Sequence, residues 1–261
     1  CPATGMPLNP DPHFLGQCAA HKMPPPALDG PEGPAAVYCP ETGWYYLFLS
    51  YGWLGDGYDI RAGRPRDPLG PYLDYEGKRL LGESLGLKLA NSYIFRAKAP
   101  HVKSGGGWSW GGLRGPGHGV PFRDPVTGRW FFVHHIRDGN PRDRRYDPVY
   151  DRHRYRHHYL MVRPMFFVDG WPVLGPEPFQ GESLEALDLP DGAMWEVIVL
   201  DGRDNRMKTS GNVRLPAEGH LLRHSVCYRC ADFENGGETL AFTGIDEYGQ
   251  ACWGKLAERP N

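Results

Sequence analysis

One pattern occurs twice in this chain: a short strand, a Pro-x-Thr-Gly turn and then a strongly aromatic strand. The two copies occupy residues 32–51 and 117–135. A turn of this composition between two apolar runs is typical of a β-hairpin. When the two turns are superposed, Glu32 of the first copy falls beside His118 of the second. The repeat therefore predicts that one kind of hairpin presents a carboxylate and an imidazole at almost the same place, as in a composite site.

Two more strands are predicted after each hairpin, so that each unit has four antiparallel strands. The expected third and fourth strands are 58–64 and 71–73 in the first copy, and 159–167 and 171–174 in the second. Residues 82–115 and 137–156 are interpreted as insertions. Repeated four-stranded units joined by variable segments are typical of β-propeller blades. The 35 glycines and 26 prolines suit many short strands joined by tight turns.

The pattern changes beyond residue 182. Residues 183–191 are polar and acidic, which predicts a linker. Short strands resume at Met194, and their alternation predicts a small all-β module. We therefore expect two domains, a partial propeller at 1–182 and a barrel-like module at 193–257. The second is so short that we expect it to pack on the first for stability.

Composition and charge exclude several classes of function. A formal net charge of −2 at pH 7 gives no electrostatic case for nucleic acid or a membrane surface. No apolar run is long enough for a transmembrane helix. The basic stretch 142–156 also holds three aspartates, so we interpret it as a solvated loop, with anion binding as the alternative.

The six cysteines give only weak evidence for a metal site. Cys227 and Cys230 form a lone Cys-x-x-Cys pair, without the second pair that a zinc site of four ligands would need. We interpret the cysteines as structural, either reduced or incidentally paired.

Glu32 and His118 are the candidates for chemistry. Glu32 precedes an apolar strand and is flanked by glycine and proline, so its carboxyl either faces a substrate or is a solvated strand end. His118 lies in a stretch, 115–119, that contains three glycines, and these allow close backbone approach and unusual dihedral angles. It could be a general base, a metal ligand or an ordinary turn histidine.

Other histidines and tryptophans are weaker candidates. His134 and His135 are adjacent on a predicted strand and should point to opposite faces, so we discount a metal cluster built from them and from His153–His158. Trp108 and Trp110 lie in a glycine-rich loop where they could stack on a sugar ring, although a plain loop explains them equally well.

Several of these segments, in this order, resemble glycoside hydrolase family 43. The segments that carry the resemblance are 32–34, 45–52, 58–64, 70–74, 115–118 and 169–173. Within the family the chain is most similar to endo-1,5-α-L-arabinanases that carry a C-terminal β-barrel module, because 239–246 and 252–255 resemble the end of that module.

The resemblance implies a fold, a reaction and roles for two residues. It implies an all-β chain, the C-terminal part of a five-bladed β-propeller followed by a small β-barrel, and an inverting hydrolase of arabinan or arabino-oligosaccharides. Glu32 matches the general acid, and His118 matches the histidine associated with a calcium ion. We also expect an extracellular monomer. No position here matches the general base, since Asp11 lacks the aromatic strand context of that motif.

The missing base suggests a fragment. Residues 1–5 resemble a further copy of the Pro-x-Thr-Gly turn, so we expect the chain to be the C-terminal portion of a longer enzyme and to be inactive alone. Two alternatives remain open: an exo-acting α-L-arabinofuranosidase or β-xylosidase of the same family, and a non-catalytic carbohydrate-binding propeller.

Overall fold

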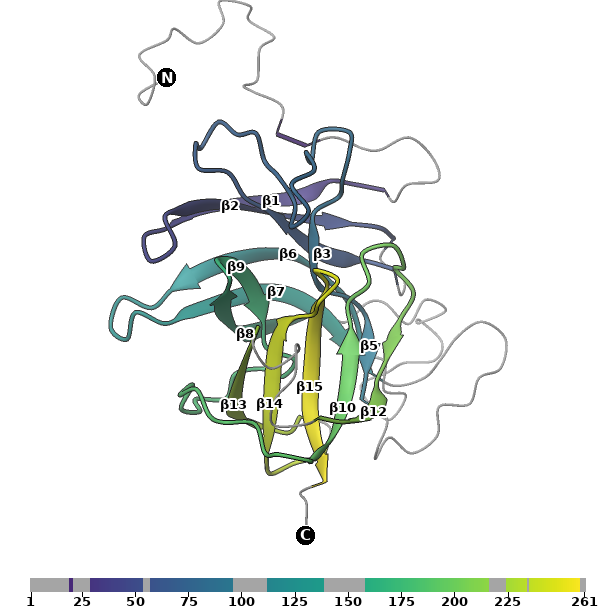
Figure 1. Ribbon diagram of the computed structural model, residues 1–261. Coiled ribbons are helices and arrows are strands. Elements are labelled where there is room, and N and C mark those ends of the chain that lie inside the picture. Colours follow the sequence, from purple (N-terminus) through teal and green to yellow (C-terminus); the bar gives the residue numbers. More distant parts are fainter. Residues whose placement is uncertain are drawn as a thin grey trace, which may run out of the picture.

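The computed structural model describes residues 19–20, 29–53, 57–95, 112–138, 158–215, 224–233 and 235–258. Within these ranges all regular structure is β, as the sequence predicts, and it forms three sheets (Figure 1). The strands are β1 (Glu32–Cys39), β2 (Trp44–Tyr51), β3 (Asp59–Gly63), β4 (Leu87–Ala90), β5 (Tyr93–Ile94), β6 (Leu113–Arg123), β7 (Trp130–Asp138), β8 (Tyr159–Val168), β9 (Trp171–Leu174), β10 (Met194–Val199), β11 (Lys208–Thr209), β12 (Gly211–Arg214), β13 (Ser225–Ala231), β14 (Glu238–Ile245) and β15 (Ala251–Glu258). In the part of the chain so described, no helix has the length and apolarity needed to span a membrane.

The two repeated hairpins form as predicted. Strands β1 and β2 begin the first sheet, of order β1-β2-β3-β4, and β6 and β7 lie inside the second, of order β11-β5-β6-β7-β8-β9. Both turns close on a glycine in the left-handed region, Gly43 at φ 68° and Gly128 at φ 72°. In the second turn the Asp124 carboxylate also accepts a hydrogen bond from the backbone of Val126 at 3.0 Å. A side chain at either glycine position would strain this conformation, which explains the repeated Thr-Gly.

The predicted third strands are confirmed as β3 and β8, and the second predicted fourth strand is confirmed as β9. The prediction of a strand at 71–73 was wrong. Leu73 forms only isolated bridges with Arg64 and Arg79, because Pro71 lacks the N–H that a ladder requires. The fourth strand of the first sheet is β4, which lies in the segment interpreted as an insertion.

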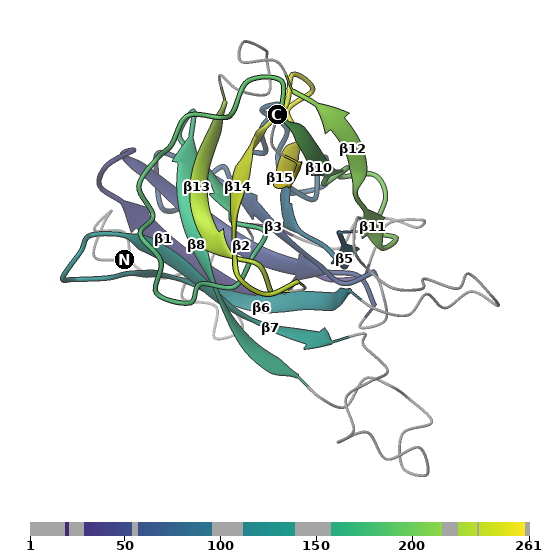
Figure 2. The same cartoon turned by 90° about the horizontal axis from the view of Figure 1, so that it is seen from below.

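The third sheet has the order β12-β10-β15-β14-β13, and Figure 2 shows these strands side by side. Its contacts confirm one part of the prediction for residues 193–257, namely that these strands pack on the rest of the chain. Trp253 of β15 is fully buried and its indole N–H donates to the carbonyl of Leu174 at 2.6 Å, and Thr243 of β14 donates to the same carbonyl at 2.8 Å. One apolar core therefore includes residues of all three sheets, among them Phe48, Phe132 and Trp253.

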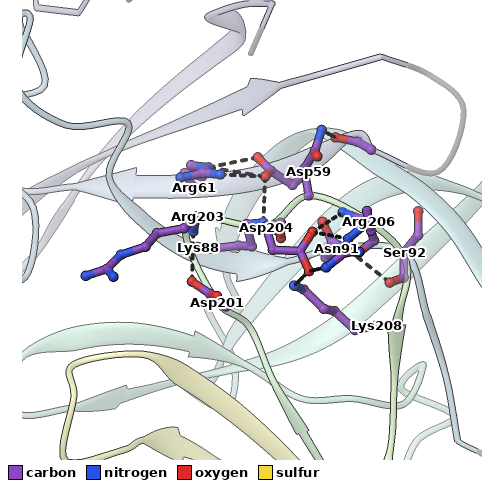
Figure 3. A network of polar contacts seen from close by, with 12 residues as sticks. Asp59, Arg61, Lys88, Asn91, Ser92, Asp201, Arg203, Asp204, Arg206 and Lys208 are labelled. Atoms are coloured by element: carbon purple, nitrogen blue, oxygen red, sulfur yellow. Dashed lines mark hydrogen bonds and ion pairs between the residues drawn. The ribbon is translucent and has the colours of Figure 1, made fainter. Parts of the chain in front are cut away.

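The segment after β10 is attached to the first two sheets. Strand β11 pairs in parallel with β5 in the second sheet. Next to it, a buried network of charges joins this segment to β3 and β4 (Figure 3). Asp59 forms ion pairs with Arg61 at 2.9 Å and with Lys88 at 3.1 Å, and Lys88 donates to the carbonyl of Asp204 at 2.8 Å. Burial lowers the pKa of Lys88 to about 8, although Asp59 opposes this shift.

The four described cysteines, Cys39, Cys227, Cys230 and Cys252, are free and buried. Burial raises the pKa of the Cys227 thiol to about 11. A thiol with so high a pKa is a poor nucleophile near neutral pH, and the four buried cysteines pack as small apolar side chains, in line with the structural role that we predicted.

Candidate active site

The structure brings Glu32 and His118 together through a third residue, Tyr58. The Tyr58 hydroxyl donates a hydrogen bond to Glu32 Oε2 at 2.6 Å and lies 3.0 Å from His118 Nδ1. Glu32 is at the start of β1, His118 lies within β6, and Tyr58 immediately precedes β3. The predicted proximity of carboxylate and imidazole is therefore confirmed, although their chemical roles are a separate question.

The backbone around these residues is irregular in both hairpins. The β1–β2 register shifts between Glu32 and Ala35, and the β6–β7 register shifts on both sides of Gly117. His118 has φ 49°, in the left-handed region, and its backbone N–H donates to Ser50 Oγ at 2.9 Å. Bulges re-aim side chains at sheet ends. Here both side chains are exposed at the same end of the two sheets, where a ligand can reach them.

Two glycines allow this close approach. A Cβ at Gly117 would lie 1.9 Å from Cε1 of Tyr58, and a Cβ at Gly33 would lie 2.7 Å from Cδ2 of His118. Gly33 also has φ 54°, a conformation that other residues rarely adopt. The glycine pattern around Glu32 and His118 thus has a steric cause, as the sequence predicts.

The contacts of Tyr58 indicate where its hydroxyl proton lies. Tyr58 is buried, and its pKa is raised well above its usual value, first by burial and then by its bond to Glu32. The phenol therefore keeps its single proton and donates it to Glu32. With the phenol proton directed at Glu32, the contact with His118 is a hydrogen bond when Nδ1 carries a proton. The other carboxyl oxygen of Glu32, Oε1, does not take part in the hydrogen bond with Tyr58.

Two further histidines border the site. The ring of His135 stacks on Tyr58 with centroids 5.8 Å apart and lies 5.7 Å from the ring of His118. His158 Nδ1 is 3.1 Å from His135 Nδ1. Burial lowers the pKa of His135 to about 4, and the neighbouring His158 and His118 add to this effect, so His135 is neutral near neutral pH.

His134 points the other way, as its adjacency to His135 predicts. Its Nε2 accepts a hydrogen bond from Arg163 at 2.9 Å, and its pKa is lowered well below the usual value, chiefly by complete burial. His134 is thus structural. His135 and Tyr58, which the sequence reasoning did not assign to the site, belong to it. His135 lies opposite Gly117 in the β6–β7 pair, next to His118. The sequence could have indicated this only if the register of the two strands had been known.

The predicted substrate-binding residues Trp108 and Trp110 lie outside the described residues. So do Asp11, which we did not assign as the base, and the basic stretch 142–156, which we interpreted as a solvated loop. Among the residues that are described, no group of three or more His, Cys, Asp or Glu side chains could hold a metal ion. The described part of the site thus offers one carboxylic acid, one phenol and a set of imidazoles.

A cleft of about 660 Å³ lies elsewhere, between the loop 74–88, the segment 200–203 and the β14–β15 turn. Glu32, Tyr58 and His118 do not line it. The Glu32 site differs from this cleft in that its exposed carboxyl group shares one tyrosine hydroxyl with an imidazole.

The fold is similar to that of a glycoside hydrolase. The crystal structure of the glycoside hydrolase, family 43 YxiA protein from Bacillus licheniformis matches with a TM-score of 0.67 and 25% identity, over 87% of this chain and 56% of that one. No protein-family model matches the chain.

Two curated relatives narrow the comparison. The extracellular endo-alpha-(1->5)-L-arabinanase 2 of Bacillus subtilis (strain 168) is 32% identical over 219 residues, 78% of this chain and 41% of its own length. The extracellular endo-alpha-(1->5)-L-arabinanase of Thermotoga petrophila is 32% identical over 233 residues, 84% of this chain and 44% of its own. The chain thus spans less than half the length of the curated relatives that it matches.

Proposed function

We propose that this chain is part of a family 43 glycoside hydrolase that cleaves α-1,5-L-arabinofuranosidic bonds within arabinan and inverts the anomeric configuration. One observation carries the proposal: Glu32, held by Tyr58 beside His118, occupies the exposed end of a hairpin. The chain around it is similar over about four-fifths of its length to two endo-arabinanases.

In this proposal Glu32 is the general acid. The Tyr58 hydroxyl fixes Oε2, so that a proton on Oε1 is presented in one direction, towards the oxygen of the scissile bond. Transfer of this proton to the glycosidic oxygen as the bond breaks lets that oxygen leave as an alcohol instead of a high-energy alkoxide, and leaves Glu32 as a carboxylate. Inversion needs a second carboxylate as base, roughly 6.5–9.5 Å from the acid to leave room for water. We place this base in a part of the longer protein beyond this chain, and we expect the chain alone to be inactive.

The architecture proposed with this function is a β-propeller followed by a barrel. The first two sheets would be the C-terminal blades of five, and the third would belong to the barrel module. The support is the pair of matching hairpins, each followed in its sheet by two further antiparallel strands, β3 and β4 after the first and β8 and β9 after the second. A crystal structure of the full-length protein with any other number of blades, or with an open third sheet, would refute this.

We also propose a calcium ion at His118. The described residues would supply at most one ligand, Nε2 of His118, because Nδ1 contacts Tyr58; calcium prefers oxygen ligands, so water oxygens would have to supply the rest of its coordination. Bound there, the ion would polarise water and substrate oxygens. We expect the dialysed full-length protein to retain calcium, measured by elemental mass spectrometry, and the His118→Ala variant to lose it. Equal calcium in both proteins would remove His118 from the site.

The two relatives are named extracellular, and on that basis we propose that this protein is secreted too. Recovery of the protein in the cell fraction rather than the medium would contradict this. We further propose that it is a monomer, which light scattering on the full-length protein would test.

The products of linear arabinan test the function directly. We expect the full-length protein to release a mixture of arabino-oligosaccharides at early times, because an endo-acting enzyme cuts at internal bonds. Chromatography of the products distinguishes endo-acting cleavage from the two alternatives. Arabinose alone would indicate the exo-acting alternative, and binding without any cleavage would indicate a carbohydrate-binding protein.

A further inference from the structure

The cleft between the first and third sheets has the features of a second binding site. Its volume of about 660 Å³ is within the usual range for ligand sites. Three segments that are far apart in the sequence line it: the loop before β4, the segment after β10 and the β14–β15 turn. Such a cleft exists only because the third sheet packs on the first.

An aromatic side chain is held at its edge without packing in the core. Tyr248 is 74% exposed, at the β14–β15 turn. The turn is braced, because Asp246 Oδ1 accepts hydrogen bonds from the backbone N–H groups of Tyr248 at 3.0 Å and Gln250 at 2.8 Å. An exposed ring on a rigid turn is suited to stack on a flat apolar surface, such as one face of a sugar ring.

A second ring and a fixed floor complete the cleft. Tyr75 packs on Trp171 with ring centroids 5.7 Å apart, and it approaches the β14–β15 turn so closely that a Cβ at Gly249 would lie 2.5 Å from its Cδ1. On the floor, Arg61 and Lys88 are held in the buried network around Asp59. The cleft is thus largely preformed, which reduces the entropy lost when a ligand binds.

The charges that line the cleft indicate the class of ligand. Four basic side chains, Arg61, Lys78, Lys88 and Arg203, are matched by as many acidic ones. The Arg203 side chain extends away from the buried network (Figure 3). Since Arg61 and Lys88 are also paired with Asp59, the cleft has no large net charge of either sign with which to attract an ion. It offers many hydrogen-bond donors and acceptors beside two aromatic rings, and this combination suits a neutral ligand rich in hydroxyl groups.

We propose that this cleft is an accessory subsite that binds a neutral arabinan chain away from the bond being cleaved, with Tyr248 as the stacking platform. The identity of the sugar rests on the proposed function. The cleft shares no residue with the Glu32 site, so it would hold the polymer close to the enzyme without taking part in the chemistry.

Affinity electrophoresis of the full-length protein in gels containing linear arabinan tests the proposal. We expect Tyr248→Ala to weaken retention about 3- to 10-fold, as expected for loss of one aromatic stacking contact. Its rate on a short arabino-oligosaccharide should be unchanged. The matched control is Phe233→Ala. Phe233 is also an exposed aromatic residue (54%), but it lies in the β13–β14 turn at the other end of β14.

Equal retention of the wild type and Tyr248→Ala would overturn the subsite. Loss of thermal stability in Tyr248→Ala, with retention unchanged, would show that another part of the longer protein occupies the cleft. Neither result would affect the proposed function, since that depends on cleavage and on Glu32. Conversely, an intact rate in Glu32→Gln would remove Glu32 as the general acid and leave the retention result standing as evidence for sugar binding.

Discussion

Glu32→Gln in the full-length protein is expected to lower kcat on linear arabinan by roughly 10²- to 10⁴-fold, the usual contribution of a general acid. The amide has the same shape as the acid, and its oxygen can still accept the hydrogen bond from Tyr58, so the surrounding structure should be preserved. What it lacks is a proton to transfer. Steady-state kinetics should therefore show a large loss in kcat with little change in KM, since ground-state contacts to the sugar remain.

A synthetic arabinofuranoside with an acidic aryl leaving group sharpens this test. Such a leaving group needs little protonation, so Glu32→Gln should retain far more activity on it than on arabinan. Glu41→Gln is the matched control, because Glu41 is in the turn of the same hairpin and forms a partly exposed ion pair with Arg123 at 2.8 Å. Equal losses on both substrates, or a similar loss in Glu41→Gln, would contradict the role of Glu32 as the acid.

Lys255→Met is expected to destabilise the protein by about 3–5 kcal/mol, the usual cost of removing one partner from a buried ion pair. Lys255 is 2% exposed and forms ion pairs with Glu177 at 2.7 Å and with Asp232 at 2.8 Å. Burial raises the pKa of Glu177 even though Lys255 opposes this shift, which shows how poorly solvated that carboxyl group is. Without the ammonium group, two carboxyl groups would be left in a site with little access to water.

Chemical denaturation measures this loss. Arg229→Ala is the control, because Arg229 and Glu238 form an exposed pair at 3.6 Å, and such pairs contribute about 0–1 kcal/mol. The triple variant Lys255→Met, Glu177→Gln, Asp232→Asn should be more stable than Lys255→Met alone, since it leaves no unpaired charge. If the triple variant is no more stable, the loss in Lys255→Met comes from packing rather than from unpaired charge. Lys255 is on β15 and Glu177 follows β9, so the measurement also reports how firmly the third sheet is attached.

The amino-acid sequence by itself determined the local structure. A Thr-Gly turn between apolar runs predicts a hairpin because only glycine adopts the left-handed turn conformation without strain, and both hairpins are present. Their repetition placed Glu32 beside His118, since identical turns fix the same register in each copy. The side-chain alternation of a strand likewise separated His134 from His135.

Only the tertiary structure decided which residues from other segments complete the site and the sheets. Tyr58 and His135 join Glu32 and His118 because β3 and β7 bring them there, and such contacts depend on strand pairing across long loops rather than on any short spacing. Strand β4 takes the edge of the first sheet in place of residues 71–73, and β11 crosses from the C-terminal part into the second sheet. Pairings of this kind depend on which edges the whole fold leaves available, and a short polar segment such as Lys208–Thr209 becomes a strand only when a neighbouring edge supplies its partners.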